Sequence, residues 1–417
     1  MHGPANIPAK EVISTESWYP VEFEQFYRYP VCFTRSVFDP ENPVLPDMVQ
    51  KAGKDHPKNI AVFVDDGLLP GRPGLLNEIR DFCRHHADLL RLAADPVVFP
   101  GGETVKNTWK HVQRATDILN AAGIDRHGLV IAVGGGALLD MAGFAAAIFH
   151  RGVEIIRLPT TTLAQNDAGI GVKNGINQYG QKNCLGTFSV PAAVICDFDF
   201  TETLPFDHFI SGAAEAFKIA LIRDSSFFSF LELNAPLLKY RQAGPTQEMI
   251  QRCARLHLDH IAGRGDPFES GSARPLDYGH WSAHKMEILS GHKLPHGLAV
   301  AVGIALDSFY AWQKSLISET DFHRIVTALS KCGLPVYSPY LACTDELGRL
   351  EMEHGLEEFR LHLGGTLTFT MPDSIGNSLE LNEMDFEIVR QGIAFLKRYS
   401  ENSNNTQQTT KDEIPRT

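Results

Sequence analysis

Three histidines and one glutamate carry the strongest signal for chemistry in this sequence. His280 and His284 stand four residues apart in a helical pattern, so both imidazoles would lie on one helix face, and His296 follows downstream. Isolated histidines are more often surface or satisfied core residues. Glu215, however, lies in an apolar helical run, where an unpaired carboxylate would be costly. Imidazoles and a carboxylate together predict a divalent metal site.

A glycine triplet indicates a second kind of site. Gly134, Gly135 and Gly136 follow an apolar run directly, and a helical pattern begins at Ala137. At such a turn backbone amides can approach a pyrophosphate, and the helix dipole favours anions, so the placement suits a dinucleotide. The spacing is not G-x-G-x-x-G, and a tight turn without any ligand fits the triplet equally well.

Polar side chains gather in the segment 160–183. Its threonines, lysines, acids and amides are Thr160, Thr161, Thr162, Asp167, Lys173, Asn174, Asn177, Lys182 and Asn183. One interpretation is an exposed polar loop. The other is a pocket for phosphate and hydroxyl groups, because each substrate hydroxyl needs a hydrogen-bond partner once water is excluded.

The elements that must position these residues differ between the two halves of the chain. In the first half, apolar runs predict strands at 60–64, 128–133, 154–158 and 193–196, with helices at 74–93 and 137–150. This alternation predicts a parallel sheet. After residue 205 the patterns are mainly helical, at 210–222, 247–261, 281–289 and 297–315, with one late strand at 366–371.

These patterns predict an N-terminal α/β Rossmann-like domain and an all-α C-terminal domain. The predicted division is 1–55 for an extension with the first strands, 56–205 for the nucleotide-binding domain, 206–400 for the helical metal- and substrate-binding domain, and 401–417 for a disordered polar tail.

Composition narrows the function classes. The 417 residues carry a net charge of −12 without a long basic run, which speaks against nucleic-acid binding and against binding to an acidic membrane. No signal-peptide pattern and no run of about 20 apolar residues is present, so we expect a cytoplasmic protein that acts on small molecules. The seven cysteines form no CxxC pair and fit neither a disulfide framework nor a thiolate zinc site.

Taken in order, the motifs resemble the 3-dehydroquinate synthase superfamily of metal- and NAD-dependent sugar phosphate cyclases. The resemblance covers residues from about 60 to 310 and rests on PGGETVK at 100–106, GGGALLD at 134–140, RG at 151–152, LPTT at 158–161, the 167–183 segment, AAEAFK at 213–218 and GHWSAH at 279–284. It implies the dehydroquinate synthase-like fold. In the family's reaction NAD transiently oxidises a hydroxyl, phosphate is eliminated, NADH returns the hydride, and an aldol step closes the ring.

The resemblance also implies residue roles. The metal ligands would be Glu215, His280 and His296, with zinc the usual ion and cobalt an alternative. NAD would be held by Asp65, Glu103, Lys106, Gly134, Gly135, Gly136, Asp140, Thr160, Thr161, Lys182 and Thr203. Catalytic groups would be Asp167, Lys173, Lys218 and His284, and Lys182 and Asn183 would contact the substrate. Arg151 would reach the phosphate in the neighbouring subunit, which implies a homodimer, and Arg360 would replace a late phosphate-binding lysine.

Three positions depart from the 3-dehydroquinate synthase pattern. The family pattern has an arginine seven residues before the first metal histidine, but this sequence has Ala273 there and an arginine, Arg274, one position later. Asp259 stands in place of a lysine of the pattern, and Asp277 in place of an asparagine. These changes remove positive charge from the place of the substrate carboxylate, and a buried carboxylate without a partner is disfavoured. The sequence therefore predicts a substrate without a carboxylate, sedoheptulose 7-phosphate, and an enzyme of the epi-valiolone synthase type, with Asp259, Arg274 and Asp277 in its substrate site.

Three alternatives remain. Arg274 could serve as the missing arginine and His284 is a feature of 3-dehydroquinate synthases, so that activity is the first alternative. A metal-dependent alcohol or glycerol dehydrogenase shares the two-domain layout but releases NADH; the lysine- and asparagine-rich segment and the Glu215 to Lys218 motif argue against it. A catalytically silent binding protein is the third, and the intact Glu215, His280 and His296 argue against it. The sequence leaves the product stereoisomer and the metal's identity open.

Overall fold

A parallel sheet forms the core of the first half of the chain. The computed structural model describes residues 19–53, 57–179, 181–263, 276–362 and 367–412. The seven strands of the sheet are β1 (Val31–Thr34), β2 (Lys58–Asp65), β3 (Leu90–Leu92), β4 (Val97–Phe99), β5 (Leu129–Gly134), β6 (Glu154–Pro159) and β9 (Ala193–Asp197). Their order is β1-β9-β6-β5-β2-β3, β4 pairs with β2, and every pairing is parallel.

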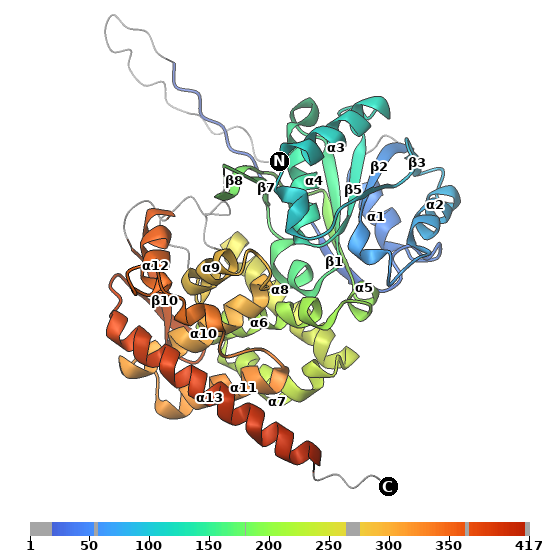
Figure 1. The fold of residues 1–417 in the computed structure, drawn as a ribbon. Helices are drawn as coiled ribbons and strands as arrows, with labels where there is room; N and C mark the ends of the chain where they lie inside the picture. Colours follow the sequence, from blue (N-terminus) through green and yellow to red (C-terminus); the bar gives the residue numbers. More distant parts are fainter. Residues whose placement is uncertain (1–18, 54–56, 180, 264–275, 363–366, 413–417) are drawn as a thin grey trace, which may run out of the picture.

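Helices cover both faces of this sheet. Val62 and Ile131 lie in an apolar cluster with α1 (Val44–Lys51) and α2 (Leu75–His85). Their sequence neighbours Phe63 and Ala132 lie in a second cluster with α3 (Trp109–Ala121) and α4 (Gly136–Ile148). Figure 1 shows the two helix pairs on opposite sides of the strands. Because successive side chains of a strand face opposite ways, a sheet covered on both sides needs the continuous apolar runs seen in the sequence.

The strand order reverses between β2 and β5. The chain passes from β2 through α2 to β3 on one side, and from β5 through α4 to β6 on the other. In open α/β sheets ligands bind in the crevice at such a reversal, beyond the carboxyl ends of the strands. Asp65 ends β2 and Gly134 ends β5, so both lie at this crevice.

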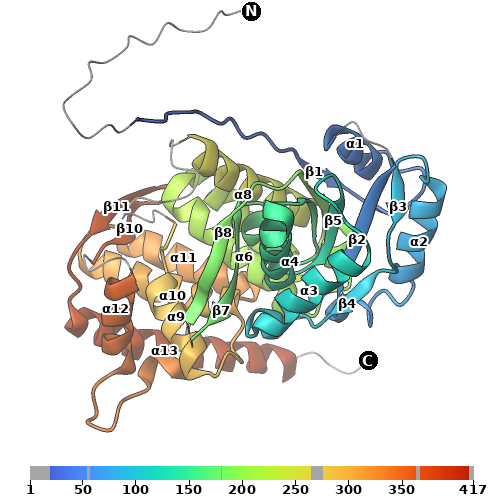
Figure 2. The same ribbon diagram turned by 90° about the horizontal axis from the view of Figure 1, so that it is seen from above.

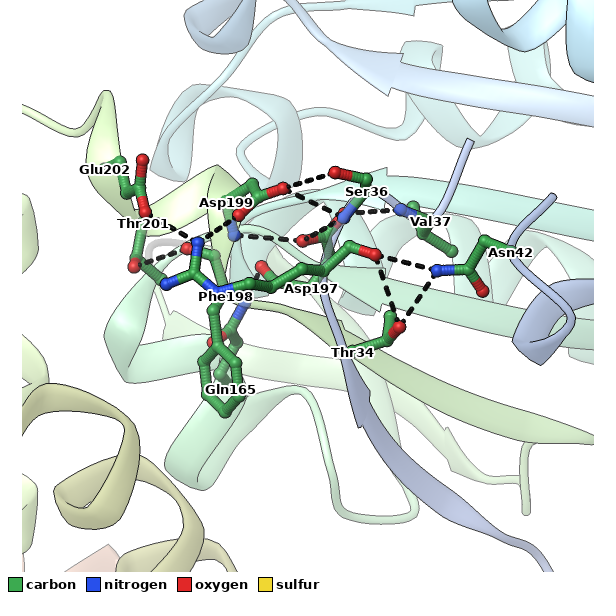
Figure 3. Close-up of polar contacts among 11 residues, drawn as sticks. Thr34, Ser36, Val37, Asn42, Gln165, Asp197, Phe198, Asp199, Thr201 and Glu202 are labelled. Carbon is green, nitrogen blue, oxygen red and sulfur yellow. Dashed lines mark hydrogen bonds and ion pairs between the residues drawn. The ribbon is translucent and has the colours of Figure 1, made fainter. Parts of the chain in front are cut away.

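A polar cluster fixes the other edge of the sheet. Asp197, at the end of β9, accepts hydrogen bonds from the backbone amides of Ser36 at 3.2 Å and Val37 at 2.8 Å. Asp199, at the start of α5 (Asp199–Glu202), accepts from the amide and hydroxyl of Ser36 and pairs with Arg35. Figure 3 shows Asp197 and Asp199 turned toward Ser36 and Val37. The cluster ties edge strand β1 to the point where the chain leaves the sheet.

The second half is a helical domain with one small hairpin. Its helices are α6 (Phe206–Arg223), α7 (Ser225–Lys239), α8 (Ala243–Gly263), α9 (His280–Leu289), α10 (His296–Gln313), α11 (Glu319–Cys332), α12 (Glu351–His362) and α13 (Phe386–Asp412). The hairpin pairs β10 (Phe369–Ser374) with β11 (Asn377–Leu381). One large apolar cluster joins these elements, and Figure 1 shows α13 along its outer side. None of the described helices is long and apolar enough to cross a membrane.

The two halves meet where α6 packs on the chain that follows β6. The Thr162 hydroxyl donates to the Phe209 carbonyl at 2.6 Å, and the Asn166 amide donates to the Gly212 carbonyl at 2.8 Å. A Cβ atom on Gly212 would lie 2.6 Å from Thr162, so only glycine permits this close contact. Helix α6, which carries Glu215, is thereby held against the end of the sheet.

The structure corrects three details of the predicted elements. The helix predicted at 74–93 ends at His85, because Leu90 to Leu92 pair with β2 as strand β3. The strand predicted at 366–371 is found as β10, with an unpredicted partner, β11. The tail predicted to be disordered from residue 401 is helical as far as Asp412, since no glycine or proline interrupts the chain between Gly392 and Asp412. Residues 413–417 lie outside the described part.

Candidate active site

Three helices bring Glu215, His280 and His296 together. One ligand atom from each lies within 4.8 Å of the others. The Oε1 atom of Glu215 is 3.7 Å from Nε2 of His280 and 3.6 Å from Nε2 of His296. Glu215 is fully buried in α6, and its Oε1 accepts no hydrogen bond from the described residues. Two imidazoles and a buried carboxylate fit a divalent cation and leave its remaining coordination positions for water or substrate.

Neighbouring groups orient His280 for this task. Its Nδ1 atom lies 3.0 Å from the Tyr278 carbonyl oxygen, so the Nδ1–H donates there and the Nε2 lone pair points at the cluster. Burial, together with the nearby Lys218 ammonium, holds the pKa of His280 well below its ordinary value. The imidazole is therefore neutral at physiological pH, as a metal ligand must be.

Asp307 of α10 fixes the turn that precedes His280. Its carboxylate accepts hydrogen bonds from the Gly279 amide at 2.9 Å and from Nε1 of Trp281 at 2.8 Å. Gly279 has φ of +78°, and a Cβ atom there would lie 2.9 Å from the Ile304 nitrogen. Asp307 thus holds the residues on both sides of His280.

The ionisation of Asp307 gives a testable pH dependence. Burial raises its pKa to about 7, against about 4 in an unfolded chain. Between these values the folded state binds a proton that the unfolded state does not, so wild-type stability falls as pH rises through this window. The asparagine of Asp307→Asn cannot titrate. We therefore expect the free energy of unfolding of this variant, relative to that of the wild type, to be about 2 to 3 kcal/mol higher at pH 8 than at pH 5. Urea unfolding of both proteins at the two pH values measures this, and a difference independent of pH would contradict it.

A series of ionisable side chains leads away from the metal cluster. The Lys218 ammonium lies 2.5 Å from Oε2 of Glu215. Burial alone would lower the pKa of Lys218, but the carboxylates of Glu215 and Asp167 raise it above its ordinary value. Asp167 in turn lies 3.1 Å from Nε2 of His257 on α8. The predicted catalytic residues Lys218 and Asp167 therefore lie beside the predicted metal ligands.

The predicted nucleotide residues meet at the reversal of the sheet. Lys106 pairs with Asp140 at 2.5 Å and also donates to the Asn183 side chain. Asn177 donates to Glu103 at 2.7 Å, which joins the strands β7 (Lys173–Gln178) and β8 (Gln181–Phe188) to this group. The later part of the polar segment that sequence left open as a loop or a pocket, from Lys173 onward, thus belongs to an antiparallel hairpin that joins predicted nucleotide and substrate residues.

The start of α4 suits a dinucleotide phosphate. Its N-cap residue Gly135 provides no side-chain hydrogen bond, so amides of the first turn have no side-chain cap. A Cβ atom on Gly134 would lie 2.9 Å from Cβ of Asp65, whose carboxylate accepts from the Gly135 amide at 3.3 Å. Thr160 and Thr161 follow β6 next to this turn, and the Thr160 amide donates to the Gly134 carbonyl. The glycine turn fits the phosphate-binding role predicted for it. Asp65, Thr160 and Thr161, which are predicted to hold NAD, lie beside this turn.

One ion pair joins the hairpin to the metal cluster. Lys182 of β8 lies 2.8 Å from Oε1 of Glu287 on α9, and Oε2 of Glu287 lies 3.1 Å from Nδ1 of His296. The rings of His284 and His296 are 6.0 Å apart, so His284 also belongs to this group. Figure 2 shows β7 and β8 between α4 and α9, at the junction of the two domains.

The remaining predicted residues lie at several places around the two domains. Four of them are exposed. Thr203 lies at the end of α5 and Asp259 on α8, while Arg151 follows α4 and Lys173 begins β7. Arg360 pairs with Glu357 on its own helix, α12. Asp277 lies just before α9, close enough to Lys218 to raise its pKa. Ala273 and Arg274 lie outside the described residues. All these roles stay predictions.

Sequence reasoning missed three residues of the site: His257, Glu287 and Asp307. Glu287 follows His280 by seven residues and His284 by three, which places all three on one helix face, so spacing could have found it. Asp307 is an acid in an apolar helix, the same signal that identified Glu215. For His257 we find no comparable signal.

Comparison with known proteins places this geometry in a family. Residues 96–211 match the 3-dehydroquinate synthase N-terminal family, and residues 212–353 match its C-terminal counterpart. The chain belongs to the 3-dehydroquinate synthase family. The resemblance and the two-domain fold predicted from the sequence are confirmed.

Individual relatives within the family carry different activities. A 2-epi-5-epi-valiolone synthase of Streptomyces glaucescens is 32% identical over 89% of this chain and 92% of its own length. A 3-dehydroquinate synthase of a Jannaschia species is 36% identical over 61% of this chain and 68% of its own. The structure of a 2-epi-5-epi-valiolone synthase from Streptomyces hygroscopicus subsp. jinggangensis, with NAD+ and Zn2+ bound, matches with a TM-score of 0.79 and 26% identity, over 91% of this chain and all of that one.

Proposed function

We propose that this chain is an NAD- and divalent-metal-dependent cyclase that converts sedoheptulose 7-phosphate into a C7 cyclitol of the 2-epi-5-epi-valiolone or 2-epi-valiolone type, releasing phosphate. The observation that carries the proposal is the similarity to 2-epi-5-epi-valiolone synthases over nearly the whole chain, combined with Glu215, His280 and His296 in metal-binding geometry. The enzyme class is then a phosphate-eliminating carbon–oxygen lyase.

The residues at the site support this assignment. Bound metal would act as a Lewis acid on the substrate's oxygens, and NAD would provide reversible oxidation of one hydroxyl. Glu215, His280 and His296 would hold zinc or cobalt, and the α4 turn with Asp65, Lys106 and Asp140 would hold NAD. Lys218 and Asp167 line the same region as an ammonium and a carboxylate that can bind and orient substrate hydroxyls. His284 and Lys173 would position the departing phosphate, and Arg151 would complete the phosphate site of a homodimer partner.

The charge around Lys218 bears on the choice of substrate. The Asp277 carboxylate lies near enough to Lys218 to raise its pKa, and it stands where 3-dehydroquinate synthases are expected to carry a neutral asparagine. A second acid, Asp259, replaces a lysine. A substrate carboxylate would meet repulsion from these acids, whereas the hydroxymethyl ketone of sedoheptulose 7-phosphate can donate hydrogen bonds to them.

Substrate comparison tests the proposal. The enzyme, supplied with zinc and catalytic NAD, is incubated with sedoheptulose 7-phosphate or with the keto-acid substrate of 3-dehydroquinate synthase. We expect phosphate release from the first alone, with a cyclitol identified by NMR. Turnover of the keto acid alone would establish the 3-dehydroquinate synthase activity, which the Jannaschia relative favours, and would overturn the proposed substrate.

A further inference from the structure

Glu287 is a buried acid that none of the predicted roles includes. It lies on α9 with 4% of its surface exposed, and each carboxylate oxygen has a different cationic or imidazole partner. Oε2 faces Nδ1 of His296 at 3.1 Å, and Oε1 faces the Lys182 ammonium at 2.8 Å. The residue therefore joins a predicted metal ligand to the hairpin that carries predicted substrate and cofactor contacts.

A second metal ion is a poor explanation of this arrangement. Ligand atoms of His284, Glu287 and His296 do lie within 4.8 Å of one another. The Lys182 ammonium, however, already occupies one oxygen of Glu287 and would repel a cation there. His296 also directs its Nε2 toward Glu215, which leaves Nδ1 as a donor to Glu287. A hydrogen bond from an imidazole N–H to a carboxylate accounts for both distances without a further ion.

We propose that Glu287 is a positioning residue that tunes the metal centre and couples it to the β7–β8 hairpin. The proposal deepens the proposed function, since it rests on a metal held by Glu215, His280 and His296. The Glu287 carboxylate fixes the tautomer and the ring orientation of His296 and makes its Nε2 a stronger donor. The Lys182 ammonium partly neutralises the same carboxylate. The position of Lys182 on the hairpin therefore sets how strongly Glu287 polarises His296.

This arrangement makes opposite predictions for the two partners of one ion pair. Glu287→Gln keeps the shape of the side chain but removes the charge that supports His296. Lys182→Met removes the competing cation and leaves the whole charge of Glu287 to His296. If Glu287 had only a structural role, loss of either partner would loosen α9 and the hairpin alike, and metal affinity would change in the same direction in both variants.

The experiment is a titration of the metal-stripped protein with Co2+, followed by calorimetry and by the visible absorption of the bound ion. We expect Glu287→Gln to weaken cobalt binding by about 10- to 100-fold, the usual cost of losing an outer partner of a metal-bound histidine. Lys182→Met should bind cobalt as tightly as the wild type or more tightly, while its turnover falls. Glu358→Gln is the matched control, because it removes the ion pair between Glu358 of α12 and Lys285, which lies on α9 like Glu287, and leaves the contacts of His296 unchanged. Its cobalt affinity should equal that of the wild type.

The outcomes separate this inference from the proposed function. Wild-type affinity in Glu287→Gln, or equal weakening in Glu287→Gln and Glu358→Gln, would overturn the positioning role while leaving the metal site intact. Weakening in Lys182→Met would overturn the proposed competition for Glu287. Equal cobalt binding by the wild type and His280→Ala would instead show that the metal site itself is wrong.

Discussion

His280→Ala should abolish turnover and release the metal. The residue would supply one of the three predicted protein ligands, and its Nε2 atom faces the buried Oε1 of Glu215 at 3.7 Å. Without it, Glu215 and His296 form an incomplete site, because two ligands rarely hold zinc against competing chelators. Metal content after dialysis and the rate of phosphate release measure the two effects.

The control is the same substitution at a histidine that lies outside the predicted site. His323 is half-exposed on α11 and pairs with Glu319 one turn away, remote from the predicted ligands in the sequence and from every contact described for the site. His323→Ala should keep both metal and turnover. Undiminished turnover in His280→Ala would contradict the metal assignment.

Lys218→Met should destabilise the metal-free protein strongly and the metal-loaded protein much less. Lys218 and Glu215 form an ion pair at 2.5 Å, with side chains 4% and 0% exposed. Removing the ammonium leaves a fully buried carboxylate without its nearest cation, at a cost of about 3 to 5 kcal/mol. A bound divalent ion would restore positive charge beside Glu215, so zinc should recover much of the loss. Turnover should remain low, because Lys218 is also a predicted catalytic residue.

Thermal unfolding with zinc and with a chelator tests this prediction. Lys285→Met is the matched control: its ammonium is also largely buried, at 8% exposure, but its partners Glu351 and Glu358 are more exposed and carry no predicted metal. Its loss of stability should be smaller and unaffected by zinc. An equal loss in Lys218→Met with and without zinc would contradict the proximity of a metal to Glu215.

The sequence predicted those secondary-structure elements whose burial leaves a clear hydrophobic pattern, and it missed the others. Strands β2, β5, β6 and β9 were found because burial on both faces of a parallel sheet demands continuous apolar runs. Strand β3 was missed because Leu90 to Leu92 is too short for a period of two to stand out from the helical pattern before it. The tail was misjudged because its polar composition fits a disordered chain and an exposed helix end equally well.

The candidate site shows the same limits. Glu215 could be found because an acid is conspicuous in an apolar helix, and His280 because of its spacing from His284. The contact of Lys182 with Glu287 joins residues 105 positions apart through two separate domains, and no local pattern encodes such a pairing. The same holds for His257 and Asp167, which only the packing of α8 against the chain after β6 brings together.

The most direct test of the central claim is the balance between phosphate and NADH. Metal-loaded enzyme is given sedoheptulose 7-phosphate in large excess over NAD, and released phosphate and absorbance at the NADH band are followed together. A cyclase regenerates its NAD, so we predict many phosphates per NAD with no accumulation of NADH. Accumulation of NADH in step with substrate consumption, without phosphate release, would contradict the account and establish a dehydrogenase on the same fold.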